Sequence, residues 1–138
     1  MAGKKLKKVE PDKGLKIKAN DKESLPPTLE HPIFCLKYLH KDYHLKECTK
    51  DEKAALIDTI YKLSQMTWHE IRQAPRHGTG REKIEKDSIN SSIPEICKEE
   101  NNLYALRFYG KAPFVGIQNG NIFHILYIDR NFSLYNHG

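Results

Sequence analysis

The sequence predicts an α+β fold with a short N-terminal strand, a helical hairpin and then a C-terminal antiparallel β-meander. Two Thr-x-x-Glu sequences, which begin at Thr49 and Thr67, have the spacing of helix capping boxes. The last third of the chain consists instead of short apolar runs with a period of two, and the dipeptide Asn119-Gly120 separates two of them. Helices followed by consecutive strands are typical of the α+β class.

Length and charge divide the chain into a leader and one domain. At 138 residues the chain is long enough for a single core, and we predict a domain over 31–138 preceded by a leader over 1–30. Residues 1–23 hold eight lysines and four acidic residues, so +4 of the net charge of +5 lies there. With few apolar residues, the lysine-rich leader is predicted to be disordered. We interpret it first as a solvated charge run and alternatively as an arm that contacts a nucleic-acid backbone.

The N-terminal sequence and the cysteines predict a cytoplasmic protein. No apolar stretch follows the lysines, and no apolar run is long enough for a membrane span, so neither a secretory signal nor a membrane partner is expected. Cys35, Cys48 and Cys97 form no CxxC pair and are odd in number. Free thiols in a reducing compartment are therefore expected.

The N-terminal half of the domain should contain one strand and two helices. A proline and a polar segment bound Ile33–Leu39, which is rich in β-branched and aromatic residues and is predicted to be a strand. The first capping box predicts a helix from Lys50 to about Met66, and the second predicts a short helix that ends before Pro75. A loop over 75–80 and a helix of at most two turns over Ile93–Lys98 follow, while 81–84 fits either a strand or irregular structure.

The β-meander should contain a tight hairpin. Its predicted strands are Leu103–Tyr109, Phe114–Gln118 and Asn121–Ile128. Asn-Gly tolerates the positive φ angles of a type I′ turn, which would pair Gln118 with Asn121. This register places His124 opposite Val115 among aliphatic side chains, so His124 is expected to be a hydrogen-bonded core residue.

Several common kinds of catalytic site are not predicted. His40 and His44 are four residues apart, but they lie in a predicted loop and not on a helix, so no metal site is expected. Gly78-Thr79-Gly80 lacks the lysine of a phosphate-binding loop, and the sequence has no nucleophile elbow. We therefore expect neither a metal nor a small-molecule cofactor.

Basic and aromatic residues at the strand ends are the remaining candidates. Metal-free cleavage of RNA needs a group that activates the 2′-hydroxyl, a proton donor and cations beside the phosphate. Arg107 lies inside an apolar run, so its charge must face a cleft, water or a carboxylate such as Asp129 or Glu70. Trp68 is expected in the core, with nucleotide stacking as the alternative.

The strand Tyr104-Ala105-Leu106-Arg107, the hairpin after it and a last strand that reaches Arg130 and Tyr135 resemble the RelE/ParE toxin superfamily. In ribosome-dependent members, basic residues and a terminal tyrosine or histidine line the RNA-cleaving cleft. The resemblance implies that Arg107 and Arg130 stabilise the scissile phosphate, that Tyr135 orients or deprotonates the 2′-hydroxyl and that His137 supplies the proton. It also places Lys83 and Arg81 near basic residues of family members. Together with Arg76 and His77, the basic residues of the loop over 75–80, they are expected to contact nucleic acid.

Two functions follow as expectations. The first is a metal-independent endoribonuclease that cleaves mRNA at the ribosome and is neutralised by an antitoxin protein. The second is a non-catalytic α+β module that binds a protein or a nucleic acid. The nearly neutral domain and the long connection over 75–102 depart from the family pattern, and they keep the second function open.

Overall fold

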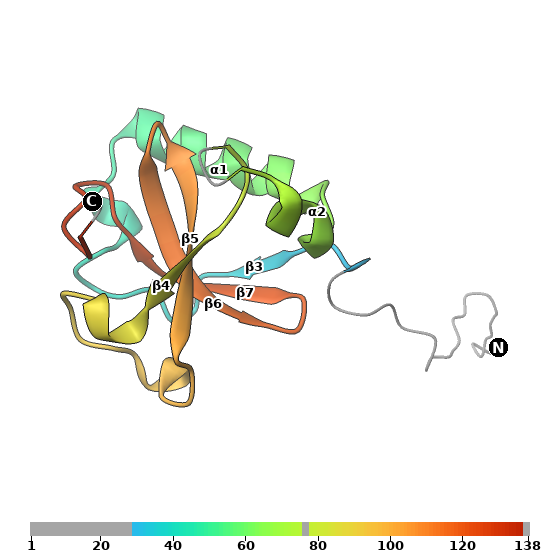
Figure 1. The fold of residues 1–138 in the computed structure, drawn as a ribbon. Coiled ribbons are helices and arrows are strands. Elements are labelled where there is room, and N and C mark those ends of the chain that lie inside the picture. Colours follow the sequence, from blue (N-terminus) through green and yellow to red (C-terminus); the bar gives the residue numbers. More distant parts are fainter. Residues whose placement is uncertain (1–28, 76–77, 137–138) are drawn as a thin grey trace, which may run out of the picture.

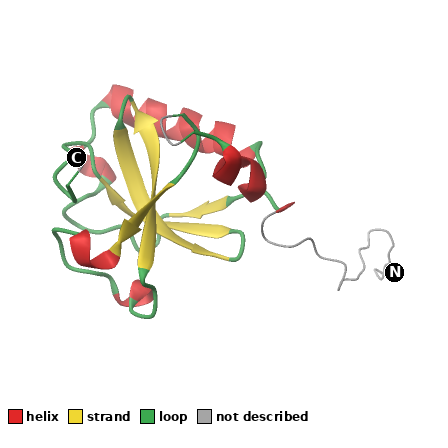
Figure 2. Ribbon diagram, viewed as in Figure 1, coloured by secondary structure: helices red, strands yellow, loops and turns green. Residues whose placement is uncertain are grey.

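A five-stranded mixed sheet forms the centre of the molecule, and two α-helices pack on one of its faces (Figures 1 and 2). The computed structural model describes residues 29–75 and 78–136, so most of the predicted leader lies outside the described residues. In chain order the strands are β3 (Ile33–Cys35), β4 (Glu82–Glu85), β5 (Asn102–Tyr109), β6 (Ala112–Asn119) and β7 (Ile122–Ile128). Across the sheet their order is β3-β7-β6-β5-β4.

The antiparallel part of the sheet agrees with the predicted meander, but the N-terminal strand differs. β4, β5, β6 and β7 pair antiparallel in sequence order, whereas β3 pairs in parallel with β7, with Ile33 opposite Ile122. β3 ends at Cys35 and not at Leu39, because the chain turns there and the Leu39 N–H donates to the carbonyl of Leu36 (3.2 Å).

The predicted hairpin register is wrong. The turn consists of Gly120 and Asn121, and Asn119 pairs with Ile122. Gly120 has φ +64°, while Asn121 has no positive φ, so the turn lacks the two positive φ angles of type I′ and has glycine at its first central position. A bulge between Val115 and Gly116 shifts the pairing further. Because the turn lies one residue later than predicted, His124 is opposite Ile117 and not opposite Val115.

Both predicted helices are present, and each begins with the expected capping box. They are α1 (Lys50–Ser64) and α2 (Trp68–Gln73). Thr49 accepts from the Glu52 N–H through its hydroxyl, and the Glu52 carboxylate accepts from the Thr49 N–H (2.8 Å). Thr67 and Glu70 repeat this arrangement at α2. The local sequence therefore predicts both starting points correctly.

The sheet is covered on both faces, which gives two apolar cores. The first core lies between the helices and the sheet and includes the fully buried Trp68, whose Nε1 donates to the Asn121 carbonyl (3.1 Å). The second core lies on the opposite face, where residues from segment 86–101 and from the chain after β7 cover the sheet. The helix expected over Ile93–Lys98 is only a 3₁₀ turn, Glu95–Cys97, and segment 86–101 begins with another, Lys86–Ser88. A third 3₁₀ turn, Leu45–Glu47, precedes α1.

Within the ranges 29–75 and 78–136, none of the helices has the length and apolarity that a membrane crossing would need.

Candidate nucleic-acid interface

Arg107 and Tyr135, two of the predicted catalytic residues, lie together at the second core. Arg107 Nη2 donates to Glu82 Oε1 at 2.7 Å, and the Arg107 side chain is only 12% exposed. Glu82 is opposite Ala105 in the register of β4 and β5, so it lies on the same face as Arg107, two residues further along. Glu82, and not Asp129 or Glu70, thus provides the carboxylate of the Arg107 ion pair.

Tyr135 is buried, and this limits its chemistry. The pKa of its phenol is raised to about 12: burial is the main cause, the Arg107 guanidinium opposes the rise, and the nearby Glu82 and Asp129 contribute to it. The phenol is therefore protonated at neutral pH. It can donate a hydrogen bond, but it is a poor acceptor for the proton of a 2′-hydroxyl.

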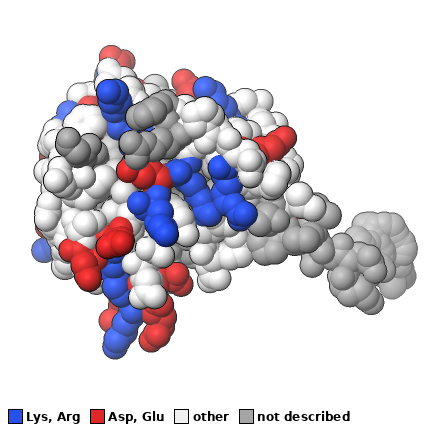
Figure 3. Space-filling view, in the orientation of Figure 1, with Lys and Arg blue, Asp and Glu red and all other residues white. Residues whose placement is uncertain are grey.

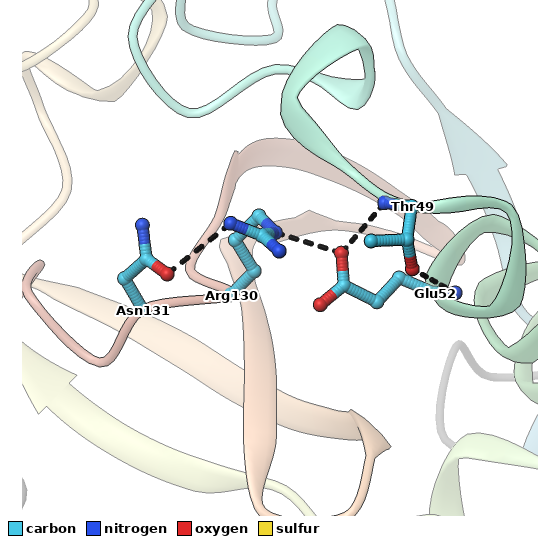
Figure 4. A network of polar contacts seen from close by, with 4 residues as sticks. All are labelled: Thr49, Glu52, Arg130 and Asn131. Atoms are coloured by element: carbon cyan, nitrogen blue, oxygen red, sulfur yellow. Dashed lines mark hydrogen bonds and ion pairs between the residues drawn. The ribbon is translucent and has the colours of Figure 1, made fainter.

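Arg130 has a different partner from Arg107. Its Nε donates to Glu52 Oε1 at 2.7 Å in the first turn of α1, and its Nη1 donates to Asn131 Oδ1 at 3.3 Å (Figure 4). This hydrogen bond is the main reason that the pKa of the Glu52 carboxyl is lowered. The structure thus joins Arg107 with Tyr135 but ties Arg130 to the helix, and the predicted His137 lies outside the described residues.

Among the four residues predicted to contact nucleic acid, Arg76 and His77 also lie outside the described residues. The other two are at the β4 edge of the sheet. The guanidinium carbon of Arg81 lies 4.0 Å from the centroid of the Tyr104 ring, and Arg81 Nη1 donates to Gln118 Oε1 at 2.6 Å. Lys83 is exposed and pairs in register with Tyr104. Arg81 therefore stacks on the Tyr104 ring, and Lys83 lies beside Tyr104 in the neighbouring strand.

Arg72 completes a group that we call the β4 patch: Arg72, Arg81, Lys83 and Tyr104. Arg72 is exposed on α2 and is close enough for its charge to lower the pKa of Arg81, although burial of Arg81 lowers that pKa more. Figure 3 shows Lys and Arg side chains gathered over β4 and beside α2. Because arginine is charged over the whole physiological range, the patch presents fixed positive charge next to an aromatic ring.

An open hollow of about 470 Å³ adjoins the β4 patch. Arg81, Tyr104 and Gln118 form one part of its lining, and Glu99, Glu100 and Asn102 form another. The hollow therefore combines a planar cation with carboxylates and amides. It has room for a small planar ligand.

Other reactive groups in the described ranges are not arranged for catalysis. No three His, Cys, Asp or Glu side chains of residues 29–75 and 78–136 gather where they could hold a metal ion. Burial raises the pKa of the Cys48 and Cys97 thiols, so neither is activated. His40 Nδ1 accepts from the Asp42 N–H (3.0 Å), so in the neutral ring Nε2 carries the proton and donates to Ser92 Oγ (2.8 Å). The imidazole therefore cannot take a proton from this serine.

Arg72, Tyr104 and Gln118 were not identified as site residues from the sequence. Tyr104 meets Lys83 only through the pairing of β4 with β5, and Gln118 meets Arg81 across the sheet. One local signal was available for Lys83. Successive residues of Glu82–Glu85 point to alternate faces of the sheet, so the exposed Lys83 and the buried Ile84 lie on different faces.

Comparison with known proteins gives no match to this chain, whether to a family model, to a curated sequence or to a solved structure.

Proposed function

We propose that this protein is a binding module for single-stranded RNA and that the β4 patch contacts the RNA. The observation that carries the proposal is the Arg81 guanidinium, which is stacked on Tyr104 and anchored by Gln118. Single-stranded RNA exposes unpaired bases, and proteins bind these by stacking them on aromatic rings and on guanidinium planes. The Arg81 guanidinium, which is planar, already oriented and next to an open hollow, is suited to stack on an unpaired base.

The surrounding charge supports the same proposal. Lys83 and Arg72 are exposed beside Arg81 and are suited to neutralise phosphates on either side of a stacked base. The lysine-rich leader is joined to the fold next to α2, since the Glu30 carbonyl accepts from the Trp68 N–H at 3.0 Å. In this proposal its lysines add affinity that depends on salt concentration.

Fluorescence anisotropy with a labelled short oligouridine tests the proposal. Arg81→Lys keeps the charge but removes the stacking plane, and we expect it to weaken binding by roughly tenfold, as the loss of one stacked base does. Lys83→Ala should weaken binding less and reduce its salt dependence. The control is Lys111→Ala, which removes one positive charge as Lys83→Ala does, but from the exposed turn between β5 and β6. It should have little effect on binding. The proposal fails if wild type binds no RNA, or if Arg81→Lys and Lys111→Ala bind equally well.

The second candidate is the RelE/ParE-like endoribonuclease, acting on mRNA at the ribosome in the cytoplasm and controlled by an antitoxin. The observation that favours it is the proximity of Arg107 to Tyr135 at the second core. Arg107 also borders a hollow of about 180 Å³ on the helix side of the sheet, whose lining includes Thr79 and Lys62 but not Tyr135. Thr79 follows the segment that contains Arg76 and His77. Because of its raised pKa, Tyr135 would orient the 2′-hydroxyl and another group would deprotonate it.

Expression in a bacterial host tests this second candidate. Production of the wild type should arrest growth, and Arg107→Lys should relieve the arrest because lysine cannot make the forked contacts of a guanidinium. Circular dichroism of the purified variant must show wild-type folding, since Arg107 also pairs with Glu82. An arrest that persists in the folded variant excludes Arg107 as the catalytic cation.

A further inference from the structure

We infer that the hollow beside the β4 patch selects guanine among the bases of a single-stranded RNA. The inference rests on the proposed RNA-binding function and adds the identity of the base. Three features carry it: a guanidinium whose orientation is fixed, a pair of carboxylates that line the same hollow, and cations that lie on the patch outside it.

The Arg81 guanidinium is held in place before any ligand arrives. Tyr104 lies against its carbon at 4.0 Å, and Gln118 Oε1 accepts from its Nη1 at 2.6 Å. The Gln118 amide is itself oriented, because its Nε2 donates to the Gly120 carbonyl at 2.9 Å and its oxygen is thereby left for Arg81. A base that stacks on the guanidinium does not have to order a flexible side chain, and this preorganisation favours binding.

The carboxylates indicate which part of the RNA enters the hollow. Glu99 and Glu100 are exposed residues that line it together with Arg81. A phosphate placed there would be repelled by both carboxylates, whereas Arg72 and Lys83 offer positive charge elsewhere on the β4 patch. The hollow is therefore suited to a base, and the rest of the patch is suited to the backbone.

An ionised carboxylate only accepts hydrogen bonds, and this singles out one base. Guanine presents two adjacent donors on its Watson–Crick edge, the N1–H and the 2-amino group, and a carboxylate can accept from both at once. Adenine, cytosine and uracil each place an acceptor beside their donor, so a carboxylate gains one bond and meets one repulsion. Glu99 or Glu100 thus discriminates for guanine while Arg81 supplies the stacking surface.

Four labelled RNAs test the inference by fluorescence anisotropy with the full chain: oligouridine, and the same oligomer with one central guanosine, adenosine or inosine. We expect the guanosine oligomer to bind roughly tenfold more tightly than the adenosine oligomer or oligouridine, the discrimination of one bidentate contact. Inosine lacks the 2-amino group and should fall between them. A Glu99→Gln, Glu100→Gln double variant should lose the preference, whereas Glu95→Gln, whose side chain is 87% exposed on the preceding 3₁₀ turn, should retain it.

The possible results separate this inference from the proposed function. Equal binding of all four RNAs that is weakened by Arg81→Lys would overturn the selection of guanine and leave the proposed function standing. A guanine preference that survives in the double glutamine variant would overturn the role of the carboxylates. Absence of binding to every RNA would overturn both.

Discussion

The Glu52 carboxylate holds two parts of the chain with a single oxygen atom. Oε1 accepts from the Thr49 N–H at 2.8 Å, which caps α1, and from Arg130 Nε at 2.7 Å, which ties the chain after β7 to the same helix turn (Figure 4). The arginine bond is the main cause that lowers the pKa of Glu52, and the bond from the Thr49 N–H adds to it. One protonation event therefore weakens a local cap and a long-range ion pair together.

This arrangement predicts acid sensitivity with a defined sign. A carboxyl whose pKa is lower in the folded chain than its unfolded value of about 4.3 adds stability above that value, and the contribution is lost as the pH falls through the folded pKa. Urea unfolding at a series of pH values should therefore show a steeper loss of unfolding free energy below about pH 4.3 in wild type than in Glu52→Gln. Glu95→Gln, on an exposed residue, should keep the wild-type slope. Equal slopes in wild type and Glu52→Gln would contradict the assignment.

At the scale of elements, β6 and β7 leave no room for a side chain at Gly116, beside their bulge. A methyl group on Gly116 would overlap the backbone carbonyl of His124 and would lie 2.9 Å from Cε2 of Phe123. Neither atom can move away easily, because one belongs to the paired strand and the other to a fully buried ring. A residue without a side chain is therefore required at this position of β6.

We expect Gly116→Ala to lower the free energy of unfolding by about 2–3 kcal/mol, a typical cost of overpacking a closed site. Gly78→Ala is the matched control, since its new methyl group would be at an ordinary distance of 3.6 Å from the nearest atom, the Pro75 carbonyl oxygen. Urea denaturation of both variants measures the difference. If the two substitutions cost the same, the close approach of the strands is not what selects glycine.

At the scale of the whole molecule, the sequence predicts what depends on neighbouring residues. The capping boxes at Thr49 and Thr67 place both helix starts correctly, because a cap involves only a few consecutive residues. The parallel pairing of β3 with β7 was missed, since it joins segments that are far apart in the chain. The hairpin register failed because the turn consists of Gly120 and Asn121 and not of Asn119 and Gly120, and because no local pattern announced the bulge at Leu126 in β7.

In the candidate sites, too, the sequence predicts local requirements but not the partners that come from distant segments. That Arg107 needs a partner was predictable from the apolar run around it, but the identity of that partner, Glu82, depends on how β4 pairs with β5. Tyr135 is near Arg107 as predicted, yet its burial came from the fold of the chain after β7. The stacking of Arg81 on Tyr104 likewise needed the register of the edge strand.

The carbonyl of Asn121 accepts two N–H groups, from Ile33 at 2.9 Å and from the Trp68 indole at 3.1 Å, so it fastens the start of β3 and α2 to the hairpin turn. In mechanical terms this carbonyl is an anchor point. Tension applied to the leader reaches the Glu30 and Ile33 bonds before it reaches the rest of the sheet. A load on the leader is therefore carried first by α2, the helix that contributes Arg72 to the β4 patch, then by the end of α1, where His31 Nδ1 contacts the Ser64 carbonyl at 3.0 Å, and then by the hairpin turn.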